Sequence, residues 1–305
     1  MPNRVVAADV FTSQRQHLWD LCYRVTGSAS GADALLATCF SRTVDQPGEP
    51  DDADWRALLV QSAAMLAVET LRQRKHRKYV GPWLPSLIET GNAASTGPRP
   101  DDSRSQYDLV ESGSIAFLRA MEALDPRERL MFVLCDALGH DPVEVASTLD
   151  VPVTSVRVPL QTARRTMEHY DSTNAPPTRE VQARTAEALH HCLSHMEQHH
   201  AGALERMCTA DVEALFDSAG EFVAPLGPIR GADRVGRLLV KFVEASPPLK
   251  FSFCMLNGLP AALGTSTGRP RWAERFVLRV EACGGRISDV HVILATAKLA
   301  AVRFD

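Results

Sequence analysis

The sequence has no apolar run that approaches the roughly 20 residues needed to cross a bilayer. Its N-terminus has no positively charged stretch followed by an apolar one, so we expect no secretory signal peptide. The chain has 7 scattered cysteines and no Cys-x-x-Cys pair, a usage typical of reduced thiols. These absences argue against a membrane protein or a disulfide-stapled secreted protein and predict a cytoplasmic location.

A strong excess of basic residues is also missing. The 305 residues carry 33 Lys/Arg against 37 Asp/Glu, a formal net charge of −4, and 45% of them are apolar. This length allows two or three domains. Residues 114–170 contain 6 basic and 8 acidic residues and are net −2. Affinity for nucleic acid comes largely from neutralised phosphates, so this segment alone is expected to bind DNA weakly.

The stretch from Leu124 to Arg165 has the pattern of a helix-turn-helix. Two helix-start patterns follow each other there: Asp125, Pro126 and Glu128, then Asp141, Pro142 and Glu144. Gly139 suits the end of the first helix, because glycine adopts the left-handed conformation at little cost. Two capped helices followed by a third across a tight turn are typical of DNA-binding proteins, whose last helix enters the major groove.

The rest of the chain divides into a helical part and a mixed part. Helical spacing predicts helices within 11–45, with a break at 27–31, and over 55–71, 114–123 and 183–200. Branched and alternating segments predict strands near 212–217, 221–225, 249–256, 272–281 and 286–294, with a helix over 232–244. Helices on one face of a curved antiparallel sheet form an α+β domain in which we expect a pocket.

Three parts of the sequence resemble extracytoplasmic-function (ECF) σ70 factors that carry a C-terminal SnoaL-like (NTF2-like) domain. Residues 11–78 resemble the σ2 domain, and 124–167 resemble σ4. The matching shorter motifs are Tyr79-Val80-Gly81-Pro82-Trp83-Leu84-Pro85, Gly231-Ala232-Asp233-Arg234-Val235 and Asn257-Gly258-Leu259-Pro260. The resemblance implies all-α σ2-like and σ4-like domains followed by an α+β domain.

The expected domain organisation follows from this resemblance and from the composition of the linkers. It is a σ2-like domain over 1–88, a linker over 89–113, a σ4-like domain over 114–170, a second linker over 171–182 and a SnoaL-like domain over 183–305. The family likeness implies RNA polymerase core and promoter DNA as partners, with σ2 at the −10 element and σ4 at the −35 element.

Candidate DNA contacts are the basic residues at the end of the 55–71 helix and those near the recognition helix. They are Arg72, Arg74, Lys75, Arg77, Lys78, Arg157, Arg164 and Arg165. The basic run also suits a solvated helix end, where cations complement the helix dipole. Apolar and aromatic residues follow it, and we expect Tyr79, Pro82, Trp83 and Leu84 to make interdomain contacts.

The sequence departs from the family patterns at three places. In 30–42, Asp33 and Arg42 remain, whereas polar positions that face the polymerase in the family are Ala, Leu or Thr. The last segment, Ala295–Leu299, keeps only the Lys-Leu end of the family's N-P-D-K-L. In the recognition helix, Pro159 lacks an amide hydrogen and crowds the carbonyl of Ser155, so we expect a kink or a restart at Pro159.

The SnoaL-like likeness suggests a second function, because relatives of that fold use pocket carboxylates or a histidine as acid and base. The candidates are Asp217, Glu221, Glu274, Asp289 and His291. Asp289 and His291 lie on the same side of one strand, since side chains alternate. The alternative is a sheet whose polar side faces solvent or the σ4-like domain. His191, His195 and His199 share a helix face that no carboxylate completes, so we expect no metal site and no cofactor.

Three functions remain open from the sequence. The first is a σ-factor-like protein of transcription initiation that its C-terminal domain regulates, with a small-molecule ligand possible in that domain. The second is a degenerate σ factor repurposed as an acid/base enzyme or ligand binder that acts through the SnoaL-like pocket, for example a cyclase, isomerase or epoxide hydrolase. The third is an interaction protein that titrates a partner.

Overall fold

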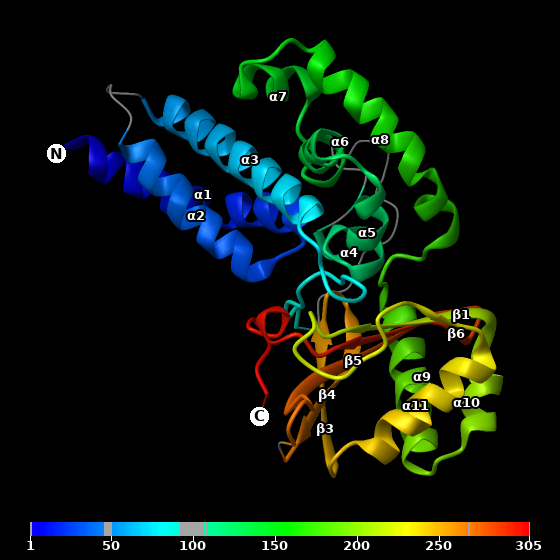
Figure 1. Ribbon diagram of the computed structural model, residues 1–305. Coiled ribbons are helices and arrows are strands. Elements are labelled where there is room, and N and C mark those ends of the chain that lie inside the picture. Colours follow the sequence, from blue (N-terminus) through cyan, green and yellow to red (C-terminus); the bar gives the residue numbers. More distant parts are fainter. Residues whose placement is uncertain (1, 46–50, 92–106, 108, 268, 305) are drawn as a thin grey trace. The chain divides into compact units, whose positions relative to one another are not determined.

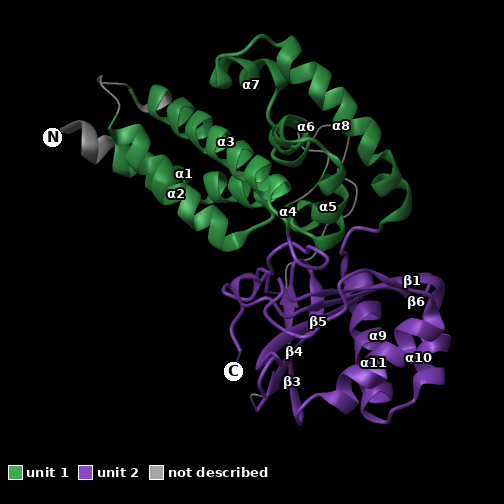
Figure 2. Cartoon of the chain, viewed as in Figure 1, with its two compact units in different colours: residues 1–78, 96–174 green, residues 79–95, 175–305 purple. Residues whose placement is uncertain are grey.

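The computed structural model describes residues 2–45, 51–91, 107, 109–267 and 269–304. The chain forms two compact units, which are Met1–Lys78 with Thr96–Asn174 and Tyr79–Ser95 with Ala175–Asp305 (Figure 2). Residues 79–91 therefore group with the C-terminal part of the chain, although they follow the third helix in sequence. Residues 92–106 and 108, most of the expected first linker, lie outside the described residues.

Three helices open the first unit and pack together: α1 (Pro2–Thr26), α2 (Ala29–Val44) and α3 (Asp52–His76) (Figure 1). Gly27, at φ 69°, separates α1 from α2 in a left-handed conformation. The side chain of Ser28 then caps α2 by accepting from the amide of Gly31, and Asp51 caps α3 through the amide of Asp54. The buried stripes of these helices, which include Leu18, form one core.

The rest of this unit is a series of shorter helices. They are α4 (Leu109–Ser112), α5 (Ile115–Ala120) with a 3₁₀ turn at Met121–Ala123, α6 (Pro126–Phe132) continuing as a π-helical turn over Val133–Ala137, α7 (Pro142–Leu149) and α8 (Thr154–Thr173). α6, α7 and α8 form the predicted helix-turn-helix. α3 packs against both α6 and α7, so the σ2-like and σ4-like parts contact each other within this unit.

The predicted caps of the helix-turn-helix are confirmed. The Asp125 side chain accepts from the amide of Glu128 (2.9 Å), while the Glu128 carboxylate accepts from the amide of Asp125 (2.9 Å), a complete capping box. Asp141 accepts from the amide of Val143 at 2.7 Å. Gly139 is left-handed at φ 77°, as predicted for the end of the first helix.

The predicted restart of the recognition helix at Pro159 is wrong. α8 runs from Thr154 to Thr173 with Pro159 inside it. Val156 and Leu160, on either side of the proline, are both buried in the core of the unit. Their burial outweighs the one hydrogen bond to Ser155 that proline cannot make, since tertiary packing supplies most helix stability.

The second unit is an α+β domain with a six-stranded sheet in the order β2-β1-β6-β5-β4-β3. Its strands are β1 (Cys208–Asp217), β2 (Ile229–Arg230), β3 (Leu249–Leu256), β4 (Leu259–Ser266), β5 (Arg275–Cys283) and β6 (Arg286–Ile293). Its helices are α9 (Arg179–Glu197), α10 (Ala201–Met207) and α11 (Ala232–Ala245), with a 3₁₀ turn at Thr296–Lys298. β1 and β6 run parallel and the other neighbours antiparallel.

The sequence predicted one strand that does not form and missed two that do. Residues 221–225 are a loop in which Val223 is exposed, and the sheet instead gains the short β2 and β4, which carries Pro260 and Gly264. Proline and glycine are both unfavourable inside a strand, so the sequence pattern did not predict β4. β4 forms because it pairs with β3 along its full length, from Leu249↔Ser266 to Leu256↔Leu259.

The helices cover one face of the sheet, where the apolar core of the unit lies (Figure 1). Alternate residues of neighbouring strands point into it, such as Ala214 and Phe216 on β1 and Val290 and Val292 on β6. Leu189 and Leu193 of α9 pack against them. Among the described residues, no helix has the length and apolarity that crossing a membrane requires.

A histidine pair within the first unit gives a pH-dependent stability. His17 of α1 and His140, just before α7, place their Nε2 atoms 3.1 Å apart. Burial lowers the pKa of His17 below 6.5, and the neighbouring His140 lowers it further, against an opposing effect of Asp20. The unfolded chain therefore binds this proton more readily, and the folded state loses stability as pH falls below about 6.5.

We predict that His17→Gln, which keeps a hydrogen-bonding side chain but does not titrate here, reduces the pH dependence of stability. Urea unfolding between pH 7.5 and 5.5 is expected to show a smaller loss of unfolding free energy in this variant than in the unchanged protein. His169→Gln, on the exposed side of α8, is the matched control and keeps the full pH dependence. Equal slopes for both variants would contradict the prediction.

Candidate nucleic-acid interface and C-terminal pocket

The basic end of α3 is only partly available to a nucleic acid. Arg74 forms an ion pair with Glu122 at 2.6 Å, and Lys75 donates to the backbone carbonyls of Glu122 (3.2 Å) and Leu124 (2.5 Å). The other predicted contacts in this run, Arg72, Arg77 and Lys78, are exposed and have no ion pair with a described residue. Two of the five basic residues therefore hold α3 against the segment before α6.

Glu122 is the centre of this contact. It also pairs with Arg129, whose side chain is fully buried and whose Nε donates to the carbonyl of Arg24 at 3.0 Å. Burial by itself would raise the pKa of Glu122, but the guanidinium groups of Arg129 and Arg74 hold it below its ordinary value. The carboxylate is therefore charged at neutral pH and balances a buried cation.

The recognition helix α8 has one buried and one exposed side. Val156, Leu160, Ala163, Met167 and Tyr170 face the core. Arg164 donates to both carboxylate oxygens of buried Asp136, at 2.9 and 2.7 Å, and these hydrogen bonds raise its pKa. Arg164 thus fixes α8 to the π-helical end of α6.

Arg157, Gln161 and Arg165 remain on the exposed side of α8, together with Val158, which is 63% exposed. This face could donate to phosphates or bases through two arginines and one amide, which is a small cationic surface. It is the part of the predicted DNA interface that the fold leaves open on the helix-turn-helix.

The expected interdomain segment docks onto the sheet of its own unit. The hydroxyl of Tyr79 donates to Asp217 Oδ1 (2.6 Å), and the amide of Leu84 donates to Asp217 Oδ2 (2.7 Å). Lys298 Nζ pairs with Asp217 and also donates to the carbonyl of Leu84. The same ammonium lies 4.5 Å from the ring centre of Trp83 and 4.7 Å from that of Tyr79.

Further contacts fix the rest of this segment. Leu84 and Leu87 are fully buried, and Pro82 is half-buried. Glu89 pairs with Leu256 as an antiparallel bridge at the end of β3. Residues 79–90 are therefore an ordered part of the C-terminal unit rather than a free connection.

The cavity between α11 and the sheet is almost filled. Phe242 of α11 and Phe276 of β5 meet edge to face there, with ring centres 5.2 Å apart. Gly264 lets the Phe276 ring lie directly on β4, since a Cβ at this position would come within 2.1 Å of the ring. The pocket beside these rings has a volume of about 10 Å³, and its lining includes neither a carboxylate nor a histidine. Such a space holds about one water molecule.

The five candidate catalytic residues do not converge on this cavity. Asp217 is fully buried in the ion pair with Lys298, and Glu221 and Glu274 are exposed. Asp289 and His291 lie on the sheet face opposite the helices, because Val290 and Val292 occupy the helix-covered face. There His291 Nδ1 lies 3.8 Å from Glu281 Oε1 on β5. The two residues do share one side of β6, as predicted.

Comparison with known proteins gives a consistent result. A profile of the family described as "Sigma-70, region 4" matches residues 114–167, which hold the helix-turn-helix. The chain is 28% identical to the ECF RNA polymerase sigma factor SigJ of Mycobacterium tuberculosis over 84% of this chain and 80% of that protein. It is 24% identical to the probable ECF RNA polymerase sigma factor SigI of the same organism, over 96% and 94% respectively.

The fold agrees with this likeness. The crystal structure of M. tuberculosis SigJ superposes with a TM-score of 0.70 over 98% of this chain and 100% of that chain, at 21% identity. The chain is similar to ECF σ factors over most of its length, and its residues 114–167 match σ70 region 4. It has helical σ2-like and σ4-like parts and a C-terminal SnoaL-like α+β domain, as the resemblance predicted.

Three charged residues that pair with predicted site residues were not identified from the sequence. Glu122 and Asp136 each neutralise a predicted DNA-contacting arginine, and Lys298 neutralises a predicted catalytic aspartate. All three pairs join residues far apart in sequence. For Lys298 alone there was a signal, since it belongs to the Lys-Leu end of the family's last motif.

We predict that Glu122→Gln destabilises the first unit by about 3 kcal/mol, because it leaves buried Arg129 without a counter-charge. Urea unfolding monitored by circular dichroism measures this loss. Glu180→Gln removes the exposed pair with Arg184 and is the control, with an expected change below about 0.5 kcal/mol. An equal loss of unfolding free energy in the two variants would show that Glu122 does not stabilise the contact between α3 and the segment before α6.

In the second unit, we predict that Asp217→Asn costs about 3–5 kcal/mol, because the Lys298 ammonium then lacks its charged partner. The double variant Asp217→Asn/Lys298→Met is expected to recover part of this loss. Asp233→Asn, at an exposed pair with Arg237, serves as the control. Trypsin cleavage at Arg77 or Lys78 followed over time provides a second measurement, since loosening of the docked segment should accelerate it.

Proposed function

We propose that this chain is an initiation factor that binds RNA polymerase core and promoter DNA, with its C-terminal domain regulating the helical domains. The observation that carries the proposal is the helix-turn-helix at the residues that match σ70 region 4, with both caps intact and one face of α8 exposed. The likeness to σ factors over most of the chain supports the same function.

In this proposal the isolated protein binds DNA weakly. The segment 114–170 is net −2, and the apolar Val158 is exposed near the start of α8. Arg74 and Lys75 are held by the Glu122 contact, so they reach DNA only after α3 separates from the segment before α6. We therefore assign promoter binding to the complex with polymerase, which supplies further contacts and favours the open arrangement.

In this proposal the C-terminal domain regulates the helical domains by holding the segment that follows α3. No ligand in the cavity between its sheet and helices is needed. About 10 Å³ of space leaves no room for a small organic molecule. The domain instead holds residues 79–90, which directly follow the basic end of α3. This geometry does not favour the alternative of an acid/base enzyme acting through the SnoaL-like pocket.

The proposal predicts that tagged protein retains purified RNA polymerase core and that the complex binds double-stranded DNA fragments at about 150 mM salt. Fluorescence anisotropy with and without core measures the second step. Pro159→Arg adds a cation to α8 and is expected to tighten DNA binding by a few-fold, whereas Pro159→Ala removes the ring without adding charge. Failure to retain core, together with absence of DNA binding, would overturn the proposal.

A further inference from the structure

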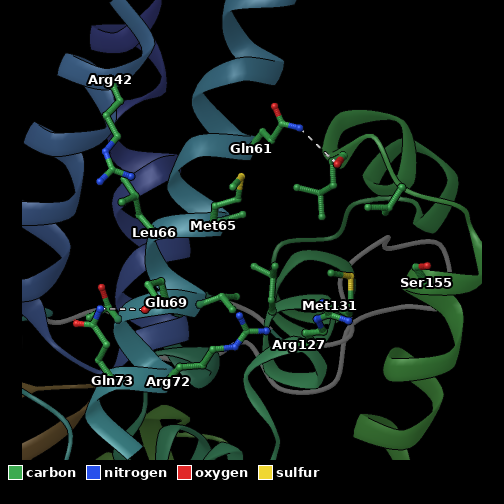
Figure 3. A pocket seen from close by; sticks show the side chains of 16 residues that line it. Arg42, Gln61, Met65, Leu66, Glu69, Arg72, Gln73, Arg127, Met131 and Ser155 are labelled. Carbon is green, nitrogen blue, oxygen red and sulfur yellow. Dashed lines mark hydrogen bonds between the residues drawn. The ribbon is translucent and has the colours of Figure 1, made fainter. Parts of the chain in front are cut away.

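A ligand-sized groove lies within the first unit, between α3 and the helix-turn-helix. Its volume is about 800 Å³, which falls in the range of small-molecule sites. Residues from α3, from α6, from the α7–α8 turn and from the end of α2 line it (Figure 3). The groove is unlike the C-terminal cavity, which side chains fill.

The floor of this groove is apolar. Leu130 and Met131 of α6 line it but are only 6% exposed each, whereas Met65 of α3 (67% exposed) and Val151 (37% exposed) are its open apolar side chains. Methionine side chains adapt to the shape of an apolar ligand because they are unbranched and polarizable. Covering Met65 and Val151 removes apolar surface from water, which favours an apolar ligand body.

Three arginines, Arg42, Arg72 and Arg127, also line the groove, with a single carboxylate, Glu69. That carboxylate accepts from Gln73 at 2.9 Å. None of the three arginines has a hydrogen bond or ion pair with a described residue, in contrast to Arg74, Arg129 and Arg164 nearby. Figure 3 shows Arg72 and Arg127 extending toward each other from α3 and α6. Guanidinium groups in this arrangement suit an anionic headgroup.

We propose that this groove binds an amphipathic anion, an aliphatic chain with a carboxylate or phosphate headgroup. The ligand's aliphatic chain lies along Met65 and Val151, and its headgroup meets Arg72 and Arg127. A DNA backbone would satisfy the arginines but leave the apolar floor in water, so the amphipathic ligand fits better. Because the walls come from both the σ2-like and σ4-like parts, the ligand stabilises their contact and opposes the separation that frees Arg74 and Lys75.

Isothermal titration calorimetry with decanoate, kept below its critical micelle concentration, tests the site on the full chain. Arg127→Gln is expected to weaken binding by about tenfold, the effect of losing one charge-assisted hydrogen bond. Met65→Glu, at an exposed position that tolerates a polar side chain, should weaken it through repulsion of the anion. Arg165→Gln, an exposed arginine away from the groove, is the control and should bind as the unchanged protein does.

Two further ligands separate the parts of the proposal. Decanol supplies the chain without the charge, and inorganic phosphate supplies charge without the chain; each is expected to bind far more weakly than decanoate. Equal binding of either one, or equal affinity of all three variants, would overturn the proposal. Anionic phosphatidylglycerol vesicles distinguish a membrane surface, because binding to vesicles but not to monomeric decanoate would also overturn it. These measurements need neither polymerase nor DNA, so their failure leaves the proposed function standing.

Discussion

The arrangement of the helical unit depends on one carboxylate, Glu122. It balances fully buried Arg129 and at the same time binds Arg74 at the end of α3. A buried guanidinium without a partner is costly, so Glu122 must stay near Arg129 whether or not α3 is docked. The Lys75 contact adds less, because its side chain is exposed, whereas the Arg74 side chain is mostly buried. The docked state of α3 therefore depends more on the Arg74–Glu122 pair than on Lys75.

In the C-terminal unit a second buried ion pair, Asp217–Lys298, has a role like that of Glu122 in the helical unit. Asp217 ends β1, and Lys298 lies in the turn after β6. Both members also bond to residues 79–84, through Tyr79 and Leu84, and Asp217 accepts from the amide of Ala219 as well. Docking of residues 79–84 thus adds hydrogen bonds to the ion pair and places two aromatic rings beside the ammonium group. A carboxylate engaged in this way is a structural anchor rather than an acid or base.

Features set by local sequence could be predicted, and features set by distant partners could not. The caps at Asp125 and Asp141 and the left-handed Gly139 depend on a few neighbouring residues, so the helix-turn-helix was visible in the sequence. The pairing of Arg164 with Asp136 depends on how α8 packs on α6, and a sequence shows only that both residues are charged. The continuity of α8 through Pro159 has the same origin, because burial of Val156 and Leu160 outweighs a local preference.

The packing of residues that are distant in sequence also decides where a ligand can bind. Family likeness directs attention to the SnoaL-like domain, whose fold is compatible with a pocket, but the aromatic rings of Phe242 and Phe276 fill the space. The open volume arises where α3 meets α6, a surface that exists only because two helical parts pack imperfectly. Filling that volume would tighten the contact that holds Arg74. In the proposed function α3 separates from the segment before α6, so a ligand bound between them is coupled to that separation, whereas a ligand inside a single rigid domain is not.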